Sequence, residues 1–170
     1  MKNNRFEEKT KDIIKLAKQK GVIKSYETFC EENDSKSYSL LQEDIEYYSR
    51  LQKIETPKFQ TGDIVFVSKY TYKSGLDGQK HIFVIIDNEQ AIEITYFGFL
   101  LSSQISKASY KYNKVLKKNN QNRLNKDSIV KCDDLISISE VDIIFKIGEV
   151  SKSELEQFID TYKRYLNSMP

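Results

Sequence analysis

One stretch of the chain combines positive charge with aromatic rings. Between residues 107 and 131, eight residues are Lys or Arg and one, Asp127, is acidic, so the stretch carries +7 where the whole chain carries +2. Tyr110 and Tyr112 lie among these charges, and cations beside rings suit the phosphates and stacked bases of a nucleic acid. The alternative is a solvated loop that is rich in lysine. We predict nucleic-acid contact through Lys107, Tyr110, Lys111, Arg123 and Lys126.

His81 is the only histidine of the chain. Imidazole titrates near neutral pH, so His81 is a candidate general acid or base. The alternative is a structural role. Adjacent residues of a strand point to opposite faces, so if the neighbouring Lys80 faces a ligand, His81 packs elsewhere unless the strand begins after it.

The sequence gives no support for a cofactor. Cys30 and Cys132 lie far apart, and no Cys-x-x-Cys or Cys/His pair is present, so we expect two small core residues and no metal site. Gly75 and Gly78 are too few to form a phosphate-binding loop. We expect neither a metal nor another cofactor.

No segment indicates a membrane or a secretory signal. The longest apolar run, Ile82–Ile86, is far shorter than the ~20 residues that span a bilayer. The first twelve residues carry charges with no apolar segment behind them, unlike a signal peptide. We therefore expect a cytoplasmic protein.

The first third of the chain, residues 1–57, is predicted to be a helical extension. Apolar residues at helical spacing indicate one helix that ends near Gly21 and a second over about 38–54. Two amphipathic helices cannot bury their apolar faces alone, so we expect them to pack on the following domain. Pro57 disfavours helical angles at Thr56 and marks the boundary.

The remainder, residues 58–170, is predicted to be a barrel domain. Its strand segments are rich in Ile, Val and Phe, and Ile64–Val67 is apolar on both faces, which indicates a strand covered on each side. Ser151 and Glu154 form a capping box before a C-terminal helix. The fold class is therefore α+β: a small SH3-like, mostly antiparallel β-barrel with a C-terminal helix and an N-terminal helical extension.

Several local features are predicted within this domain. We expect a turn at Asp87–Glu89, a break or bulge near Gly98 and a turn at Asp133 and Asp134. The predicted strands are residues 62–70, 80–87, 90–101, 128–132 and 141–150.

The order of these segments resembles the MazF/PemK (Kid) toxins of type II toxin–antitoxin systems, over about residues 59–166. The segments that carry the resemblance are TGDIVFV, TYKSGLDGQKHIFVII, IEITYFGFLLSSQ and LNKDSIVKCDDL, of which the last is the most specific in order and spacing. The resemblance implies a homodimer that cleaves single-stranded RNA without a metal, through attack of the 2′-hydroxyl on the adjacent phosphate. It also implies a cognate antitoxin as partner.

The resemblance also implies site residues. Lys80 stands where the family has a catalytic Arg, and Ser102, with Ser103 beside it, where the family has Thr or Ser. Lysine keeps the positive charge but lacks the planar fork that holds two phosphate oxygens. His81 replaces the family's Pro, and Asp77 takes an acidic loop position that could orient the cation. Each residue also has an ordinary alternative, as a loop lysine, a strand-end serine or a turn residue.

These considerations leave two functions open. The first is a metal-independent endoribonuclease toxin. The second is a non-catalytic SH3-like module, derived from the toxin fold, that binds nucleic acid or protein. The replacement of Arg-Pro by Lys80-His81 is the sequence feature that bears on the choice between them.

Overall fold

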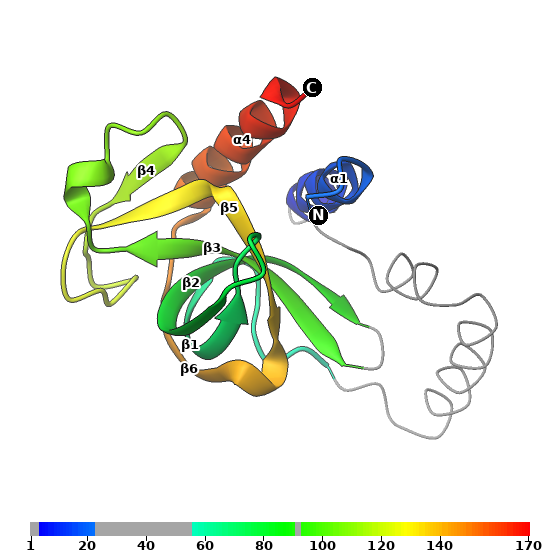
Figure 1. Cartoon of the computed structure of the whole chain (residues 1–170). Helices are drawn as coiled ribbons and strands as arrows, with labels where there is room; N and C mark the ends of the chain where they lie inside the picture. The colour runs from blue at the N-terminus through cyan, green and yellow to red at the C-terminus, as the bar shows by residue number, and fades with distance from the viewer. Residues whose placement is uncertain (1–3, 23–55, 91–92) are drawn as a thin grey trace, which may run out of the picture.

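The computed structural model describes residues 4–22, 56–90 and 93–170. The second predicted helix, over about 38–54, lies outside these residues, as does Cys30. In chain order the described elements are α1 (Asn4–Gln19), β1 (Asp63–Thr71), β2 (Asp77–Gln90), β3 (Ile94–Ser102), the 3₁₀ turn η1 (Ile105–Lys107), β4 (Asn113–Leu116), β5 (Ser128–Ser139), the 3₁₀ turn η2 (Glu140–Asp142), β6 (Ile143–Glu149) and α4 (Lys152–Ser168) (Figure 1).

The strands form one six-stranded sheet in the order β4-β5-β3-β2-β1-β6. Every strand pair is antiparallel, which confirms the predicted fold class. The loop between β4 and β5 reaches the opposite edge strand, where Glu149 N–H donates to the Gln121 carbonyl at 3.2 Å. Gly148 leaves room for this loop, because a Cβ there would lie 2.4 Å from the Asn122 carbonyl oxygen. The two edges of the curled sheet are thus bridged by a loop.

The central strands are apolar on both faces because each face is covered. Val65 and Val67 point into the inner core of the sheet, together with Phe83 and Ile85 of β2. Ile64 belongs to an outer core that α4 covers with Leu155, Phe158, Ile159, Tyr162 and Leu166. The two-sided burial predicted for β1 is confirmed.

The hairpin between β2 and β3 differs from its prediction. Asp87–Glu89 is not a turn: these residues belong to β2, which pairs with β3 through Gln90↔Ile94. The prediction was wrong because polar residues on an exposed strand end resemble a turn. A break or bulge was predicted near Gly98, but β3 runs unbroken there and the extra residue is Ile86 of β2, since the pairing shifts from Ile85↔Gly98 to Asp87↔Phe97. A Cβ on Gly98 would lie 3.0 Å from the Val84 carbonyl oxygen.

The acidic pair Asp133 and Asp134 also lies in a strand and not in the predicted turn. The pairing of β5 with β3 shifts from Phe99↔Leu135 to Leu101↔Val130, so residues 131–134 form a bulge in a continuous β5. A bulge accommodates extra residues without ending the strand. The short strand β4, which pairs with the other edge of β5, was not predicted.

Both described helices lie on the same side of the sheet, over the outer core (Figure 1). The predicted first helix is confirmed: it ends before Gly21, whose φ of 67° is left-handed. Ile13, Ile14 and Ala17 bury its apolar face against α4 and the sheet, and Lys18 forms a 3.0 Å ion pair with Glu89 of β2. Neither helix in the described ranges is both long and apolar enough to cross a membrane.

The capping box predicted at α4 is present. Ser151 Oγ accepts a hydrogen bond from Glu154 N at 3.3 Å, and the Glu154 carboxylate accepts one from Ser151 N at 2.8 Å. These bonds satisfy amides that have no partner within the helix. They fix the start of the helix that covers the outer core.

We predict that Ser151→Ala lowers the free energy of unfolding by about 1 kcal/mol, because it removes the acceptor of the cap. Ser153→Ala, an exposed serine in the same first turn, is the matched control and should leave stability unchanged or slightly raised. Urea unfolding of both variants measures this. Equal losses in the two variants would contradict a stabilising cap.

Candidate active site

The register of β2 and β3 brings together residues that lie far apart in the sequence. Ile82 of β2 pairs with Leu101 of β3. His81 and Lys80 precede Ile82, and Ser102 follows Leu101, so all of them lie where the pairing of β2 with β3 ends, although β2 continues to Asp77 beside β1. This is the end at which Ser102 also pairs with Ile129 of β5. The candidate active site therefore lies where β2, β3 and β5 meet.

Lys80 is exposed and has an unusual backbone conformation. Its φ of 50° is left-handed, although the flanking residues keep the register Lys69↔Gln79 and Val67↔His81. Non-glycine residues in this region cost of order 1–3 kcal/mol each and cluster at functional sites. The position thus carries strain that an ordinary strand lysine would not have.

His81 is half-buried at the end of the inner core. Its ring makes edge contacts with Tyr70 and Phe83, with centroids 6.0 and 6.2 Å apart. Nδ1 accepts a hydrogen bond from Ile82 N at 3.0 Å, so the neutral ring carries its proton on Nε2. Burial, with a smaller contribution from the Lys131 ammonium, lowers the pKa of His81 below its ordinary 6.5. His81 is therefore a neutral hydrogen-bond donor at pH 7.

The two serines end β3 in different ways. Ser102 is half-buried, and its Oγ accepts a hydrogen bond from Gln104 N at 3.2 Å. That bond leaves the hydroxyl proton available for a ligand. Ser103 follows the strand and is exposed, and its carbonyl accepts from Ile105 N at 3.0 Å. By strand alternation Ser102 shares the face of His81, and Ser103 continues the row of Ile82 and Leu101.

Asp77 lies at the start of β2 and is exposed. Its carboxylate accepts a hydrogen bond from Thr71 Oγ1 at 3.3 Å, across the β1–β2 hairpin. Among the described residues no ion pair joins Asp77 to Lys80. Lys80 is three positions after Asp77, about 10 Å along the strand, so Asp77 supports the hairpin that leads to Lys80.

The lysine-rich stretch is ordered by two asparagines and divides into two regions. Asn113 donates to the Lys107 carbonyl at 2.7 Å, and Asn122 donates to the Lys117 carbonyl at 2.7 Å. The first region, around Lys107, Tyr110 and Lys111, precedes β4; Tyr110 and Lys111 are exposed there and Lys107 is half-buried.

The second region, with Arg123 and Lys126, lies in the loop that reaches β6, and both side chains are exposed. Arg123 has a left-handed φ of 52°. The structure therefore does not gather all of the predicted RNA-contacting residues around Lys80.

Lys131 is a residue whose position the sequence did not single out. It lies in β5 opposite Asn113 of β4, at the bulge beside the candidate site, and it lowers the pKa of His81. Burial raises the pKa of the neighbouring Asp134, while Lys73 and Lys131 oppose that shift. Lys131 of β5 is thus a cation that acts on His81, while Lys80 precedes His81 in β2. The sequence did not predict the position of Lys131, because it depends on the bulge in β5.

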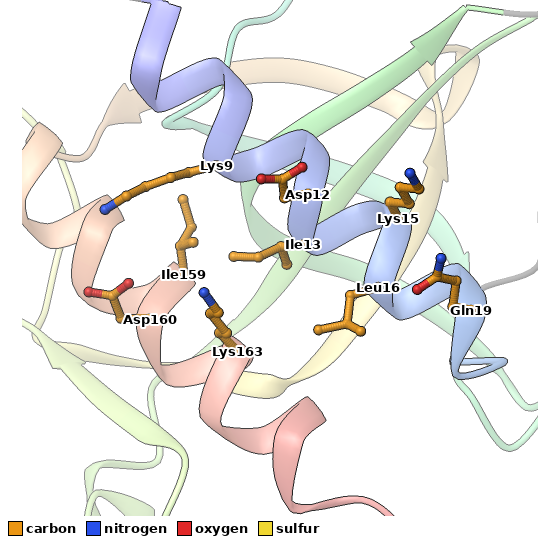
Figure 2. A pocket seen from close by; sticks show the side chains of 9 residues that line it. All are labelled: Lys9, Asp12, Ile13, Lys15, Leu16, Gln19, Ile159, Asp160 and Lys163. Atoms are coloured by element: carbon orange, nitrogen blue, oxygen red, sulfur yellow. The ribbon is translucent and has the colours of Figure 1, made fainter.

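Two hollows flank α4. The first, of about 440 Å³, lies between α1 and α4, where Ile13 and Leu16 point from α1 toward α4 (Figure 2). The second, of about 580 Å³, lies between α4 and β4 and includes Lys114 and Arg164. Lys163 and Asp160 border both. Neither hollow includes Lys80 or Ser102.

Residues 60–164 match the model of the family described as PemK-like, MazF-like toxin of type II toxin-antitoxin system. That match covers more than half of the chain. The chain therefore belongs to the PemK/MazF toxin family, as the sequence resemblance predicted.

Solved structures of this kind are similar to the chain at low identity. The Mycobacterium tuberculosis toxin MazF-mt6 is 15% identical with a TM-score of 0.48, over 62% of this chain and 96% of that chain. An endoribonuclease from Mycobacterial species is 11% identical with a TM-score of 0.49, over 70% of this chain and 100% of that chain. No curated protein sequence matches the chain.

We predict that His81 titrates with a pKa below 6.5 in the folded protein, because the half-buried ring resists protonation. As the only histidine, it gives a single imidazole signal in a proton NMR titration. Lys131→Gln should raise the pKa in part, since burial is the larger cause. A folded-state pKa at or above the value measured in urea would contradict this environment.

We predict that Lys80→Gly is more stable than Lys80→Ala by about 1 kcal/mol, because glycine adopts positive φ without strain. The matched pair is Lys69→Gly and Lys69→Ala, at an exposed lysine of the neighbouring strand, where glycine should instead be the less stable by about 0.5–1 kcal/mol. Denaturant unfolding gives both differences. The same sign at the two positions would contradict the strain at Lys80.

Proposed function

We propose that the protein is a metal-independent endoribonuclease that acts as a toxin in the cytoplasm and cleaves single-stranded RNA. One observation carries the proposal: the register of β2, β3 and β5 sets Lys80, His81 and Ser102 at one end of neighbouring strands, with Lys131 beside them. Membership of the toxin family supports it. The family also supports a cognate antitoxin as partner, and we propose a homodimer.

In the proposed reaction the 2′-oxygen of one nucleotide forms a bond to the adjacent phosphorus. The bond from phosphorus to the 5′-oxygen breaks, which leaves a 2′,3′-cyclic phosphate and a 5′-hydroxyl. The 2′-hydroxyl passes its proton to water, and the departing 5′-oxygen takes one from water, so atoms and charge balance. The reaction needs stabilisation of the negative phosphorane, a proton acceptor for the 2′-hydroxyl and a proton donor for the leaving oxygen.

The side chains at the site suit these roles. Lys80 and Lys131 supply positive charge for the non-bridging oxygens. His81 presents Nε2–H as a neutral hydrogen-bond donor, which suits a non-bridging phosphate oxygen. Ser102 can donate its hydroxyl proton to the phosphate, since its own oxygen is held by Gln104 N.

The replacement of the family's Arg by Lys80 affects the expected rate of RNA cleavage. A single ammonium holds phosphate as a point charge, whereas a guanidinium holds two oxygens at once. A second cation on β5 would restore the second contact. We therefore assign Lys131 a role shared with Lys80, which makes the Lys80-His81 sequence compatible with catalysis.

We predict that purified protein cuts a long single-stranded RNA in EDTA and that Lys80→Ala and Ser102→Ala each lower the rate by about 10²-fold or more. The products should carry 2′,3′-cyclic phosphate and 5′-hydroxyl ends. A 2′-deoxy substitution at the cleaved nucleotide should abolish cutting there, because it removes the nucleophile.

Lys69→Ala is the matched control, an exposed lysine on the adjacent strand that should cut at the wild-type rate. Folded wild-type protein that leaves every RNA intact would contradict the enzyme and favour the non-catalytic binding module. Cutting that persists in both Lys80→Ala and Ser102→Ala would place the active site elsewhere.

A further inference from the structure

The groove between α4 and β4 has the composition of a site for a nucleic-acid backbone. Three cations border it, Lys114 of β4 and Lys163 and Arg164 of α4, against one carboxylate, Asp160. Its volume of about 580 Å³ leaves room for a polymer segment. The Arg164 guanidinium is held in place by a 3.1 Å hydrogen bond to Thr161 Oγ1. The positive charge of the groove is thus partly fixed in position.

Aromatic rings lie next to this groove. Tyr112, just before β4, contacts Tyr165 of α4 edge to face with centroids 5.1 Å apart, and its hydroxyl lies 3.0 Å from Ser168 Oγ. The Lys111 ammonium lies 5.0 Å from the Tyr112 ring centre. Hydrogen bonding with Ser168 and Lys111 lowers the pKa of Tyr112. Tyr165 already stacks on Tyr162, with centroids 6.0 Å apart, and has the Lys73 ammonium over its ring. Of the two rings, Tyr112 is therefore the one suited to stack on a base, because rings beside cations suit single-stranded nucleic acids.

The same rings connect the groove with the candidate active site. Lys73, in the loop between β1 and β2, places its ammonium 5.0 Å from the Tyr165 ring centre and donates to the Asp133 carbonyl. Asp133 lies in the β5 bulge, two residues after Lys131. Contacts therefore lead from the bulge through Lys73 to Tyr165 and Tyr112, which are close in sequence to the groove residues Arg164 and Lys114. We call these residues, together with the groove, the strip.

We propose that this strip binds the nucleotides that flank the cleaved linkage of a single-stranded RNA. The inference rests on the proposed function and extends it to the length of the substrate. Unpaired bases are required, because the rings can stack only on bases that are exposed. An acidic protein segment would use the charges but not the rings, so the combination favours RNA.

The consequence is a dependence on substrate length. A short RNA that covers only the site at Lys80 and Ser102 lacks the contacts to Tyr112, Tyr165 and the groove. A longer RNA gains phosphate contacts at Lys114, Lys163 and Arg164, each of which releases counterions from the strand. Binding of the longer RNA should therefore be tighter and more sensitive to salt.

The test measures binding apart from cleavage. We would titrate a labelled single-stranded RNA of about 20 nucleotides, in EDTA and at several salt concentrations, with Ser102→Ala protein alone and with Lys114→Gln and Arg164→Gln added. We expect the slope of log affinity against log salt to fall in magnitude by about 0.7 for each lost phosphate contact, about 1.4 for both. Tyr112→Leu should weaken binding by about 5- to 100-fold.

The matched control is the double variant Lys11→Gln and Lys69→Gln, which removes the same charge from exposed positions on α1 and β1. This control variant should keep most of the slope of log affinity against log salt. If the groove variant binds like the control while wild-type protein cuts RNA, the groove inference is overturned and the proposed function stands. If wild-type protein does not cut but the groove variant loses binding, the proposed function fails, and with it the position beside a cleaved linkage, while RNA binding by the groove is supported.

A third arm separates RNA from an acidic partner. Polyglutamate should compete weakly, and Tyr112→Leu should not change its binding. Should the groove variant lose polyglutamate and RNA equally while Tyr112→Leu binds RNA normally, the groove would be a site for an acidic protein, and our inference would be wrong.

Discussion

The structure depends on the burial of its central strands on both faces. Ile64 faces the helices while Val65 and Val67 face the interior of the sheet, and β2 repeats the arrangement with Val84 and Phe83. A slip of one residue would exchange the two sets and place each in a cavity shaped for the other. The register is therefore held by packing along its whole length. The packing of the apolar side chains therefore also sets the positions of the polar side chains near the strand ends.

The candidate active site lies where the regular pairing of the strands is interrupted. There β5 bulges at residues 131–134, and Lys80 is held in a left-handed conformation. Irregular backbone of this kind aims side chains that regular strands would send to alternate faces. Lys131 of β5 acts on the half-buried His81 of β2, whose pKa it helps to lower. The catalytic roles of these residues belong to the proposed function.

Much of the fold could be predicted from local sequence. The cap at Ser151 and Glu154, the stop at Gly21 and the two-faced run at Ile64–Val67 each depend on near neighbours, and all were predicted correctly. The prediction of a turn at Asp87–Glu89 was wrong. Polar residues were taken as the end of the strand, but β2 continues through them because it pairs with β3 there. The strand β4 was missed because its four residues carry only Val115 and Leu116 as apolar signals.

The candidate site was harder to predict for the same reason. Lys80 and Ser102 came from the family resemblance, and their assigned roles stay predictions, whereas the proximity of Lys131 to His81 results from a bulge that no local pattern marks. The cations of α4 were missed as well. Lys163 and Arg164 occupy positions that look like a solvated helix face, and only the placement of β4 turns that face into the wall of a groove.

The packing of α1 on α4 has a consequence for the order in which the molecule is assembled. The ribosome makes the chain from its N-terminal side, so α1 emerges before every strand and α4 after all of them. The part of the apolar surface of Ile13 and Ile14 that α4 covers therefore stays exposed until Ile159 has been made. The outer core is completed late, so a chain that stalls before residue 152 would expose apolar side chains to chaperones and proteases. Interrupted synthesis would thus yield a fragment prone to destruction.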